Sequence, residues 1–158
     1  MALVPGAYAL TGLAASGVAP LPKNVTWEKE CGACHMAFHP SLLPGQSWAA
    51  IMSGLSQHFG EDASLDAAAE KEIADYLASH SAETWDSLAA NRQRSVDPAR
   101  PLEITATRFW LRMHRNIAPA VFSSKAVGAK QNCSACHKDA AGGMFAPQEI
   151  SIPQEKTQ

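Results

Sequence analysis

Aromatic residues are scarce in this chain of 158 residues, at 7% of the sequence, so side chains alone would build only a modest core. We therefore expect a bound group to fill part of it. Basic residues do not outnumber acidic ones, and the formal net charge of -2 argues against a nucleic-acid-binding surface. The chain is too short for a large multidomain enzyme. Its 46% of hydrophobic residues excludes a compositionally disordered protein.

Cysteine is absent outside two copies of one pentapeptide. The copies are Cys31-Gly32-Ala33-Cys34-His35 and Cys133-Ser134-Ala135-Cys136-His137. C-x-x-C-H is the c-type haem attachment sequence, in which each thiol adds to a vinyl group of one porphyrin and the histidine binds the iron. Two copies that use every cysteine predict two covalently bound haem c groups, with His35 and His137 as proximal iron ligands. The predicted attachment residues are Cys31, Cys34, Cys133 and Cys136.

Other uses of paired cysteines fit this sequence less well. Four cysteines in a small secreted chain would ordinarily suggest two disulfides, but the histidine after each pair argues otherwise. Two C-x-x-C pairs that share one zinc ion usually lie roughly 15 to 20 residues apart, whereas about a hundred residues separate these pairs. A thioredoxin-like motif would explain one pair near a βαβ unit, and no βαβ pattern is visible.

The chain divides into three parts. Residues 1–22 carry no charge and contain an apolar stretch followed by small residues, which resembles a signal peptide without its basic start. We interpret them as a leader remnant or a flexible arm. We expect a cytochrome c-like domain for the first haem at 23–90, and a linker with the domain for the second haem at 91–158. Because c-type attachment in bacteria occurs outside the cytoplasmic membrane, we expect the protein to be periplasmic.

Apolar residues recur at helical spacing in both halves. Ser47 is a predicted N-cap for a helix that Gly60 ends, and Ser64 is a predicted N-cap for a second, alanine-rich helix. The stretch Ile73–Leu77 in that helix resembles the last helix of a monohaem cytochrome c. A third helix is predicted over Ile104–Ile117. No segment alternates like a strand, so the predicted fold class is mostly α, with the haems forming the core of each half.

Four histidines remain for two distal ligand positions. His114 lies on an apolar helical face in the half that contains the second motif, so we predict that it binds the second iron. For the first iron His58 is the leading candidate and His80 is the alternative. His39 is the weakest candidate, because it lies only four residues from the proximal histidine and precedes Pro40.

Methionine is the competing type of distal ligand. The candidates are Met36, Met52, Met113 and Met144. Two of them lie on apolar helical faces as packing residues, and the other two lie close behind a proximal histidine. Methionine raises a haem potential, whereas two imidazoles lower it. We predict two bis-histidine haems.

Longer stretches around the motifs resemble a known family, the dihaem cytochromes c of the DHC type from proteobacteria. The resemblance covers nearly everything from Trp27 to Phe145. It rests on Glu30-Cys31-Gly32-Ala33-Cys34-His35, Leu42-Leu43-Pro44, Ser47-Trp48, His58-Phe59-Gly60-Glu61-Asp62-Ala63-Ser64-Leu65, Arg108-Phe109-Trp110, His114-Arg115 and Asn132-Cys133-Ser134-Ala135-Cys136-His137. The resemblance implies His58 and His114 as distal ligands.

The same resemblance implies an electron carrier and no catalytic residue. Members look like periplasmic proteins that pass electrons from a membrane b-type cytochrome, or another quinol oxidiser, to a small high-spin monohaem cytochrome. The alternative is a haem enzyme or gas-binding protein with one open iron position. We expect a monomer that binds no nucleic acid and meets the membrane only through a partner or a leader.

Charge is distributed unevenly along the chain. Residues 1–90 hold 3 basic and 10 acidic residues, net -7, whereas residues 91–158 hold 10 basic and 5 acidic residues, net +5. One interpretation is that these charges only solvate helical faces. The other is that the two ends dock different redox partners by electrostatic steering.

Overall fold

The computed structural model describes residues 21–85 and 88–153. Within them lie the α-helices α1 (Val25–Cys31), α2 (Gly45–Ser53), α3 (Ala67–Ser79), α4 (Leu88–Gln93), α5 (Arg108–Met113) and α6 (Pro119–Phe122). Short 3₁₀ helices lie at Pro40–Leu42, Leu55–Gln57, Ala82–Thr84, Ile104–Ala106, Cys133–Ala135, Ala140–Gly142 and Pro147–Glu149. The described residues form no strand, only two isolated β-bridges. The predicted mostly α class is confirmed.

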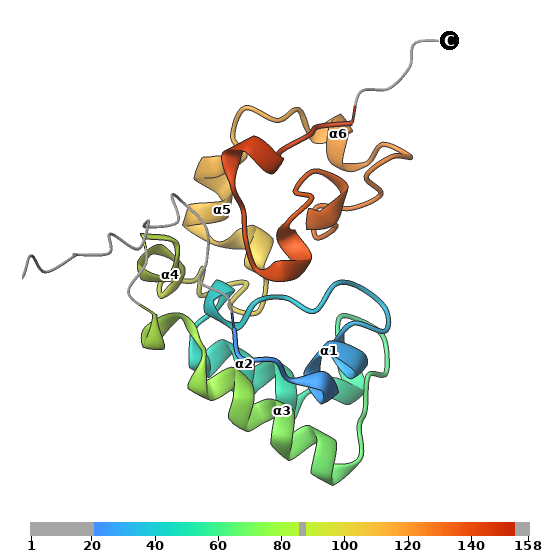
Figure 1. Cartoon of the computed structure of the whole chain (residues 1–158), viewed down its shortest axis with the longest axis vertical. Coiled ribbons are helices and arrows are strands. Elements are labelled where there is room, and N and C mark those ends of the chain that lie inside the picture. The colour runs from blue at the N-terminus through green and yellow to red at the C-terminus, as the bar shows by residue number, and fades with distance from the viewer. Residues whose placement is uncertain (1–20, 86–87, 154–158) are drawn as a thin grey trace, which may run out of the picture.

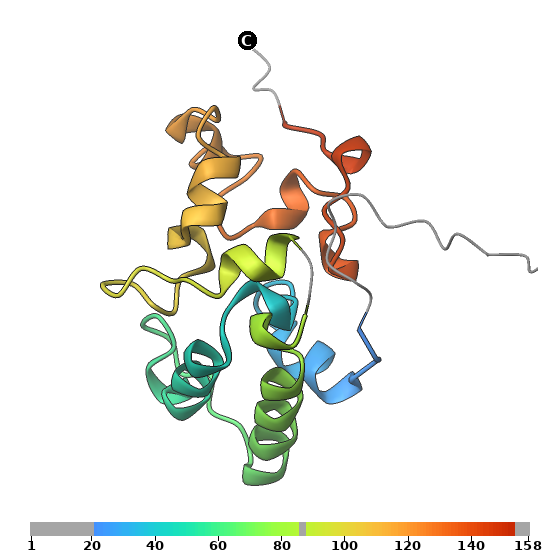
Figure 2. The same ribbon diagram turned by 90° about the vertical axis from the view of Figure 1, so that its left-hand side faces the viewer.

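The helices form two groups with α4 between them. In Figure 1, α1, α2 and α3 lie together in the lower part of the molecule, and α5, α6 and the C-terminal 3₁₀ helices lie in the upper part. Figure 2, turned by 90°, shows the same separation. α4 contacts α5 and also two 3₁₀ helices of the first group, Pro40–Leu42 and Ala82–Thr84. It therefore connects the part of the chain that follows the first motif to the part that precedes the second.

A side-chain core holds the first group together. α3 contacts both α1 and α2, and the buried residues between them are Trp27, Leu43, Trp48, Ile51, Met52, Ile73, Tyr76 and Leu77. The apolar stripe predicted for the alanine-rich helix thus faces this core. Each large apolar side chain buried in this way contributes roughly 1.5–3 kcal/mol.

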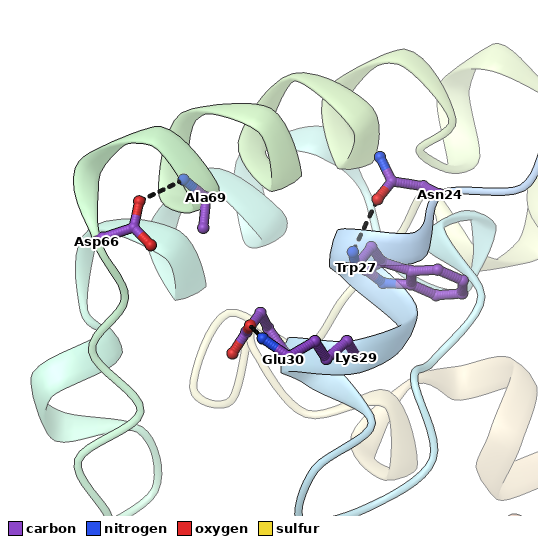
Figure 3. Close-up of polar contacts among 6 residues, drawn as sticks. All are labelled: Asn24, Trp27, Lys29, Glu30, Asp66 and Ala69. Carbon is purple, nitrogen blue, oxygen red and sulfur yellow. Dashed lines mark hydrogen bonds and ion pairs between the residues drawn. The ribbon is translucent and has the colours of Figure 1, made fainter.

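Side-chain caps fix where α1 and α3 begin (Figure 3). The Oδ1 of Asn24 accepts a hydrogen bond from the backbone N of Trp27 at 2.7 Å, and the Oδ1 of Asp66 accepts one from the backbone N of Ala69 at 3.0 Å. Each bond satisfies an N–H group that a helix start leaves free, which is worth about 1 kcal/mol. α1 was not predicted from the sequence. It ends at Cys31, the first residue of the first motif.

The cap predicted at Ser64 is wrong, and α3 begins two residues later than expected. Asp62 holds Ser64 instead, because its Oδ1 accepts hydrogen bonds from the backbone N of Ser64 at 2.9 Å and from its Oγ at 2.6 Å. This local turn leaves Asp66 as the first free acceptor before the helix.

The cap predicted at Ser47 is also wrong. Ser47 is buried inside α2, and its Oγ donates to the carbonyl oxygen of Pro101 at 2.6 Å. The backbone N–H of Gly45, at the start of α2, donates to the carboxylate of Glu83 at 2.9 Å. Partners distant in the chain therefore set the beginning of α2, which also ends well before Gly60.

The helix predicted over Ile104–Ile117 is shorter than expected. α5 begins after Thr107, whose Oγ1 accepts from the backbone N of Trp110 at 3.2 Å, and it ends at the C-cap residue His114. The Nδ1 of His114 donates to the carbonyl oxygen of Trp110 at 2.9 Å, so the ring turns back along the helix. The end of α5 thereby positions the side chain that the sequence analysis selected.

The second group buries few apolar side chains. From residue 104 to residue 153 those that are buried are Ala106, Trp110, Val127 and Ala140, of which two are alanines. A segment of this length with so small a core needs a bound group or a covalent staple to stay folded. The second C-x-x-C-H motif lies within this segment, in agreement with the expectation that haem forms its core.

None of the helices in the described ranges is long and apolar enough to cross a membrane. The interpretation of residues 1–22 concerns a stretch that, up to residue 20, lies outside the described residues.

Candidate haem sites

The first motif follows directly from α1. The helix ends at Cys31, and Gly32 is its C-cap, with a backbone N–H that donates to the carbonyl oxygen of Glu28 at 3.1 Å. A Cβ at Gly32 would overlap that same oxygen, so only glycine fits here. The tight turn releases the chain from the helix and carries it through Cys34 to His35.

None of the four cysteines is paired in a disulfide. Burial raises the pKa of Cys31 to about 11, with a further contribution from the charge of Glu30, and burial also raises the pKa of Cys133 to about 11. Burial thus disfavours the charged thiolate form of both side chains. In the part of the chain that the structure describes, no three or more His, Cys, Asp or Glu residues gather as a metal site. The arrangement favours neither disulfides nor a shared zinc ion.

His35 and His58 face each other in the first site. Their ring centroids lie 6.2 Å apart and their planes differ by 28°. Two imidazoles bound to opposite sides of one metal ion at about 2.0 Å each would place their centroids about 6 Å apart. The Nδ1 of His35 donates to the carbonyl oxygen of Met36 at 2.7 Å, which leaves its Nε2 as the free nitrogen. The separation fits an iron between the rings.

A turn with unusual backbone angles presents His58. Phe59, with φ of 52°, is the one non-glycine residue with positive φ among the described residues, and Gly60 follows with φ of 98°. The ring of Phe59 packs edge-on against His58 with centroids 5.0 Å apart. Burial, followed by the charge of His35, lowers the pKa of His58, so its ring is neutral at pH 7 and can donate a lone pair to a metal.

His114 and His137 face each other in the second site. Their ring centroids lie 6.1 Å apart, close to the value in the first site, but their planes differ by 72°. Because the Nδ1 of His114 donates to the carbonyl oxygen of Trp110, its Nε2 is free. Trp110 also stacks on the His114 ring at 4.2 Å, with planes 16° apart, which fixes the ring orientation.

His137 has a less complete set of polar partners. Its Nδ1 is buried and makes no hydrogen bond with any described residue, and Phe145 packs edge-on against the ring at 5.3 Å. Burial, with the charge of His114 as the second cause, lowers its pKa below the usual value. The ring is therefore neutral at pH 7, as a metal ligand must be.

The structure does not bring the other two histidines to either pair. The Nδ1 of His80 donates to the carbonyl oxygen of Tyr76 at 2.8 Å, and its ring packs on that tyrosine. The Nδ1 of His39 accepts from the backbone N of Ser41 at 3.2 Å, so the proton of the neutral ring is on Nε2. His39 is buried and lies 5.6 Å, between ring centroids, from Trp85.

Two of the candidate methionines have other partners. Met52 is buried in the core of the first group. The Sδ of Met36 accepts a hydrogen bond from the Oγ of Ser134 at 3.4 Å. Met36 follows the first motif and Ser134 lies inside the second, so this bond joins the two attachment segments.

Some residues around the two pairs were not found by sequence reasoning. Phe59 and Trp110, which lie in the stretches that carry the family resemblance, each contact a paired histidine. The aromatic neighbours that were missed are Phe38, which stacks on His35 at 4.8 Å, and Phe145. Phe38 lies three residues after the proximal histidine, and this short spacing was a usable signal.

The geometry of the two sites, each with a C-x-x-C-H turn and a facing pair of imidazoles within a helical fold, defines a c-type cytochrome with two haems. The family model for dihaem cytochrome c, DHC, matches residues 27–145. This chain belongs to the dihaem cytochrome c family.

Solved structures agree with this result. A diheme cytochrome c from Rhodobacter sphaeroides is 37% identical, with a TM-score of 0.70 over 80% of this chain and 100% of that one. The diheme cytochrome type c of Shewanella baltica OS155 is 34% identical, with a TM-score of 0.68 over 84% of this chain and 95% of that one. No curated protein matches the chain.

Membership of the family confirms the predicted cofactor and the general function. The protein carries two haem c groups, and the family implies electron transfer. Haem supplies an iron that cycles between the ferric and ferrous states, and the polypeptide tunes it through axial ligands, burial and hydrogen bonds.

Proposed function

We propose that this protein is a periplasmic electron carrier in which both haem irons are bound by two histidines. The main observation behind the proposal is that the same separation between two histidine rings occurs at two sites formed by different parts of the chain. Each proximal histidine has a second histidine facing it, at 6.2 Å in the first site and 6.1 Å in the second. The proposed iron ligands are His35 with His58 and His137 with His114.

Hydrogen bonds to the backbone support this assignment. In two of the four rings the Nδ1 donates to a backbone carbonyl oxygen: that of His35 to Met36 and that of His114 to Trp110. A donated Nδ1–H fixes the tautomer and increases the basicity of the nitrogen that binds the metal. Two imidazoles per iron also favour low to moderate potentials.

An iron with two protein ligands has no position left for a substrate or gas. The residues of each site then hold the haem, exclude water and keep the axial rings in place while the charge of the iron changes. Little rearrangement accompanies such a transfer. This is the reason for proposing a carrier rather than the alternative, a haem enzyme or gas-binding protein.

The proposal extends to location and partners. The attachment chemistry supports a periplasmic site, and the resemblance noted in the sequence supports a membrane b-type cytochrome or quinol oxidiser as donor and a small monohaem cytochrome as acceptor. We propose a monomer organised as two haem-binding units, residues 23–90 and 91–158. The opposite net charges of residues 1–90 and 91–158 support docking of different partners at the two units.

Carbon monoxide distinguishes the carrier from its alternative. We expect that adding it to the fully reduced holoprotein leaves the Soret band unchanged, because both irons are six-coordinate. A shifted band that corresponds to one of the two haems would contradict the carrier and favour the alternative with an open iron.

A further inference from the structure

One long segment of the second unit carries charge of a single sign. Residues 104–138, named here the basic segment, contain six basic residues and no acidic residue. The six are Arg108, Arg112, Arg115, Lys125, Lys130 and Lys138, and the structure exposes all of them. None forms an ion pair with any residue in the described ranges. In contrast, Lys29, Lys71 and Arg100, which lie outside this segment, each form an ion pair with a carboxylate.

Three of the arginines gather at α5. Arg108 and Arg112 lie four residues apart within α5 and therefore on one side of it, whereas Trp110 is buried. Arg115 lies in the turn just after the helix. The Nη1 of Arg115 donates to the carbonyl oxygen of Arg112 at 3.2 Å, which keeps it along this side. Like charges at this spacing destabilise a helix when nothing neutralises them. No carboxylate among the described residues forms an ion pair with them.

Apolar side chains lie among these charges. Leu111 is 45% exposed and Met113 is 63% exposed, both within α5. Exposed apolar residues within a charged border are typical of surfaces that bind another protein transiently. α5 ends at His114, so a partner on this surface would lie next to a side chain of the second site.

We propose that the exposed residues of α5 and of the turn that follows it, Arg108, Leu111, Arg112, Met113 and Arg115, form the docking surface for a redox protein whose own surface is acidic. This inference rests on the proposed electron-carrier function and adds the place and the charge of one partner. Charge complementarity identifies the occupant as acidic. Because the surface lies next to His114 of the second site, we infer that the occupant is a protein that exchanges electrons there. Binding of an anionic membrane would not require a position next to this histidine.

The test compares two triple variants of the holoprotein. Arg108→Gln with Arg112→Gln and Arg115→Gln removes the charge of the surface. Lys29→Gln with Lys71→Gln and Arg92→Gln removes the same charge from exposed positions outside the basic segment and serves as the control. Stopped-flow absorbance follows haem reduction by two reductants: a reduced plant-type ferredoxin, which is an acidic protein, and the methyl viologen radical, which is a small cation.

We expect the arginine variant to lose about tenfold in the rate of reduction by ferredoxin at low ionic strength, within the range that electrostatic steering produces. The difference should disappear at high salt. The control variant should stay within about twofold of the parent, and methyl viologen should reduce all three proteins at rates that do not fall.

Several outcomes would overturn the docking surface. Equal rates for the two triple variants would remove α5 from the interface. If ferredoxin and methyl viologen both reduced the arginine variant more slowly by the same factor, and its midpoint potential changed, the arginines would be assigned to contacts with the haem carboxylates instead of to docking. Binding to phosphatidylglycerol vesicles that depends on the arginines, with no dependence for ferredoxin, would assign the surface to a membrane. A failure of the electron-carrier function would be seen separately. In that case methyl viologen would not reduce the parent protein to a form in which both haems stay six-coordinate.

Discussion

The two proposed haem-binding units contain the same C-x-x-C-H pentapeptide in different surroundings. Around the first site, α1, α2 and α3 enclose eight buried apolar side chains, whereas residues 104–153 bury four, two of them alanines. The first group therefore has a side-chain core of its own. Residues 104–153 have a much smaller one, as expected where a covalently bound group takes the place of core side chains.

Charge and ring geometry differ between the units as well. Exposed acidic residues, Glu61 and Asp62, follow His58, whereas basic ones surround His114. The histidine planes differ by 28° in the first site and by 72° in the second. The angle between axial imidazole planes changes the splitting of the iron d orbitals, so the two ferric haems should be distinguishable by spectroscopy.

The largest expected effect is on folding of the second unit. Cys133→Ala with Cys136→Ala should reduce the haem content from two to one and increase amide hydrogen exchange in residues 104–150 about a hundredfold, the factor for about 3 kcal/mol of lost local stability. The matched pair, Cys31→Ala with Cys34→Ala, should leave much of the protection of α3 in place. Pyridine haemochrome absorbance and hydrogen-exchange mass spectrometry measure both. Equal loss of protection in the two units would contradict the comparison.

The next effect is on the ligands. His58→Ala and His114→Ala should each convert one of two low-spin haems to high spin, because each removes one imidazole from one iron. His80→Ala is the control and should leave both haems low spin, since its Nδ1 bonds to Tyr76 at 2.8 Å and its ring lies outside both pairs. The visible spectrum of the ferric protein measures the change. A high-spin haem in the His80 variant would mean that the wrong histidine was assigned to the first site.

Truncation in the first core should lower stability but leave both haems and their iron ligands in place. Ile73 is fully buried, so Ile73→Ala should lower the free energy of unfolding by about 2–5 kcal/mol. The visible spectrum of the second haem should not change, because that site has its own surroundings. Denaturant titration followed by circular dichroism measures the loss. Leu111→Ala, at an exposed position, should stay within about 0.5 kcal/mol, and a loss below that value for Ile73→Ala would argue against a side-chain core.

The smallest expected effect on stability comes from replacing one of two glycines by alanine, and these two variants form a matched pair. Gly143 has φ of 72°, and a Cβ there would overlap the ring of His39, so Gly143→Ala should cost about 1–3 kcal/mol. Gly60 has φ of 98° with nothing near its missing Cβ, so Gly60→Ala should cost only about 1 kcal/mol, for the backbone alone. Thermal unfolding of both variants tests this difference. Equal costs would mean that Gly143 does not pack against His39 across the two units.

Local patterns in the sequence were enough for much of this account. The motifs predicted the two haem c groups, which family membership confirms, and helical spacing predicted the buried side of α3. Both depend on residues a few positions apart. The resemblance selected His58 over His80, and the facing rings support that choice.

Contacts between distant residues could not be predicted in the same way. The start of α2 depends on Glu83 and on the bond from Ser47 to Pro101, 54 residues away. The bond between Met36 and Ser134 spans 98 residues. Propensity and periodicity carry no information about such pairs, so the helix ends and the contact between the two attachment segments are results of the structure alone.

The central claim is that two histidines bind each iron. Low-temperature electron paramagnetic resonance of the oxidised holoprotein, with haem iron quantified against protein, tests it most directly. We predict two irons per chain and two low-spin ferric signals: a rhombic one from the nearly parallel rings of the first site, and a more anisotropic one from the steeply inclined rings of the second. A high-spin signal that accounts for one iron per chain would contradict the claim.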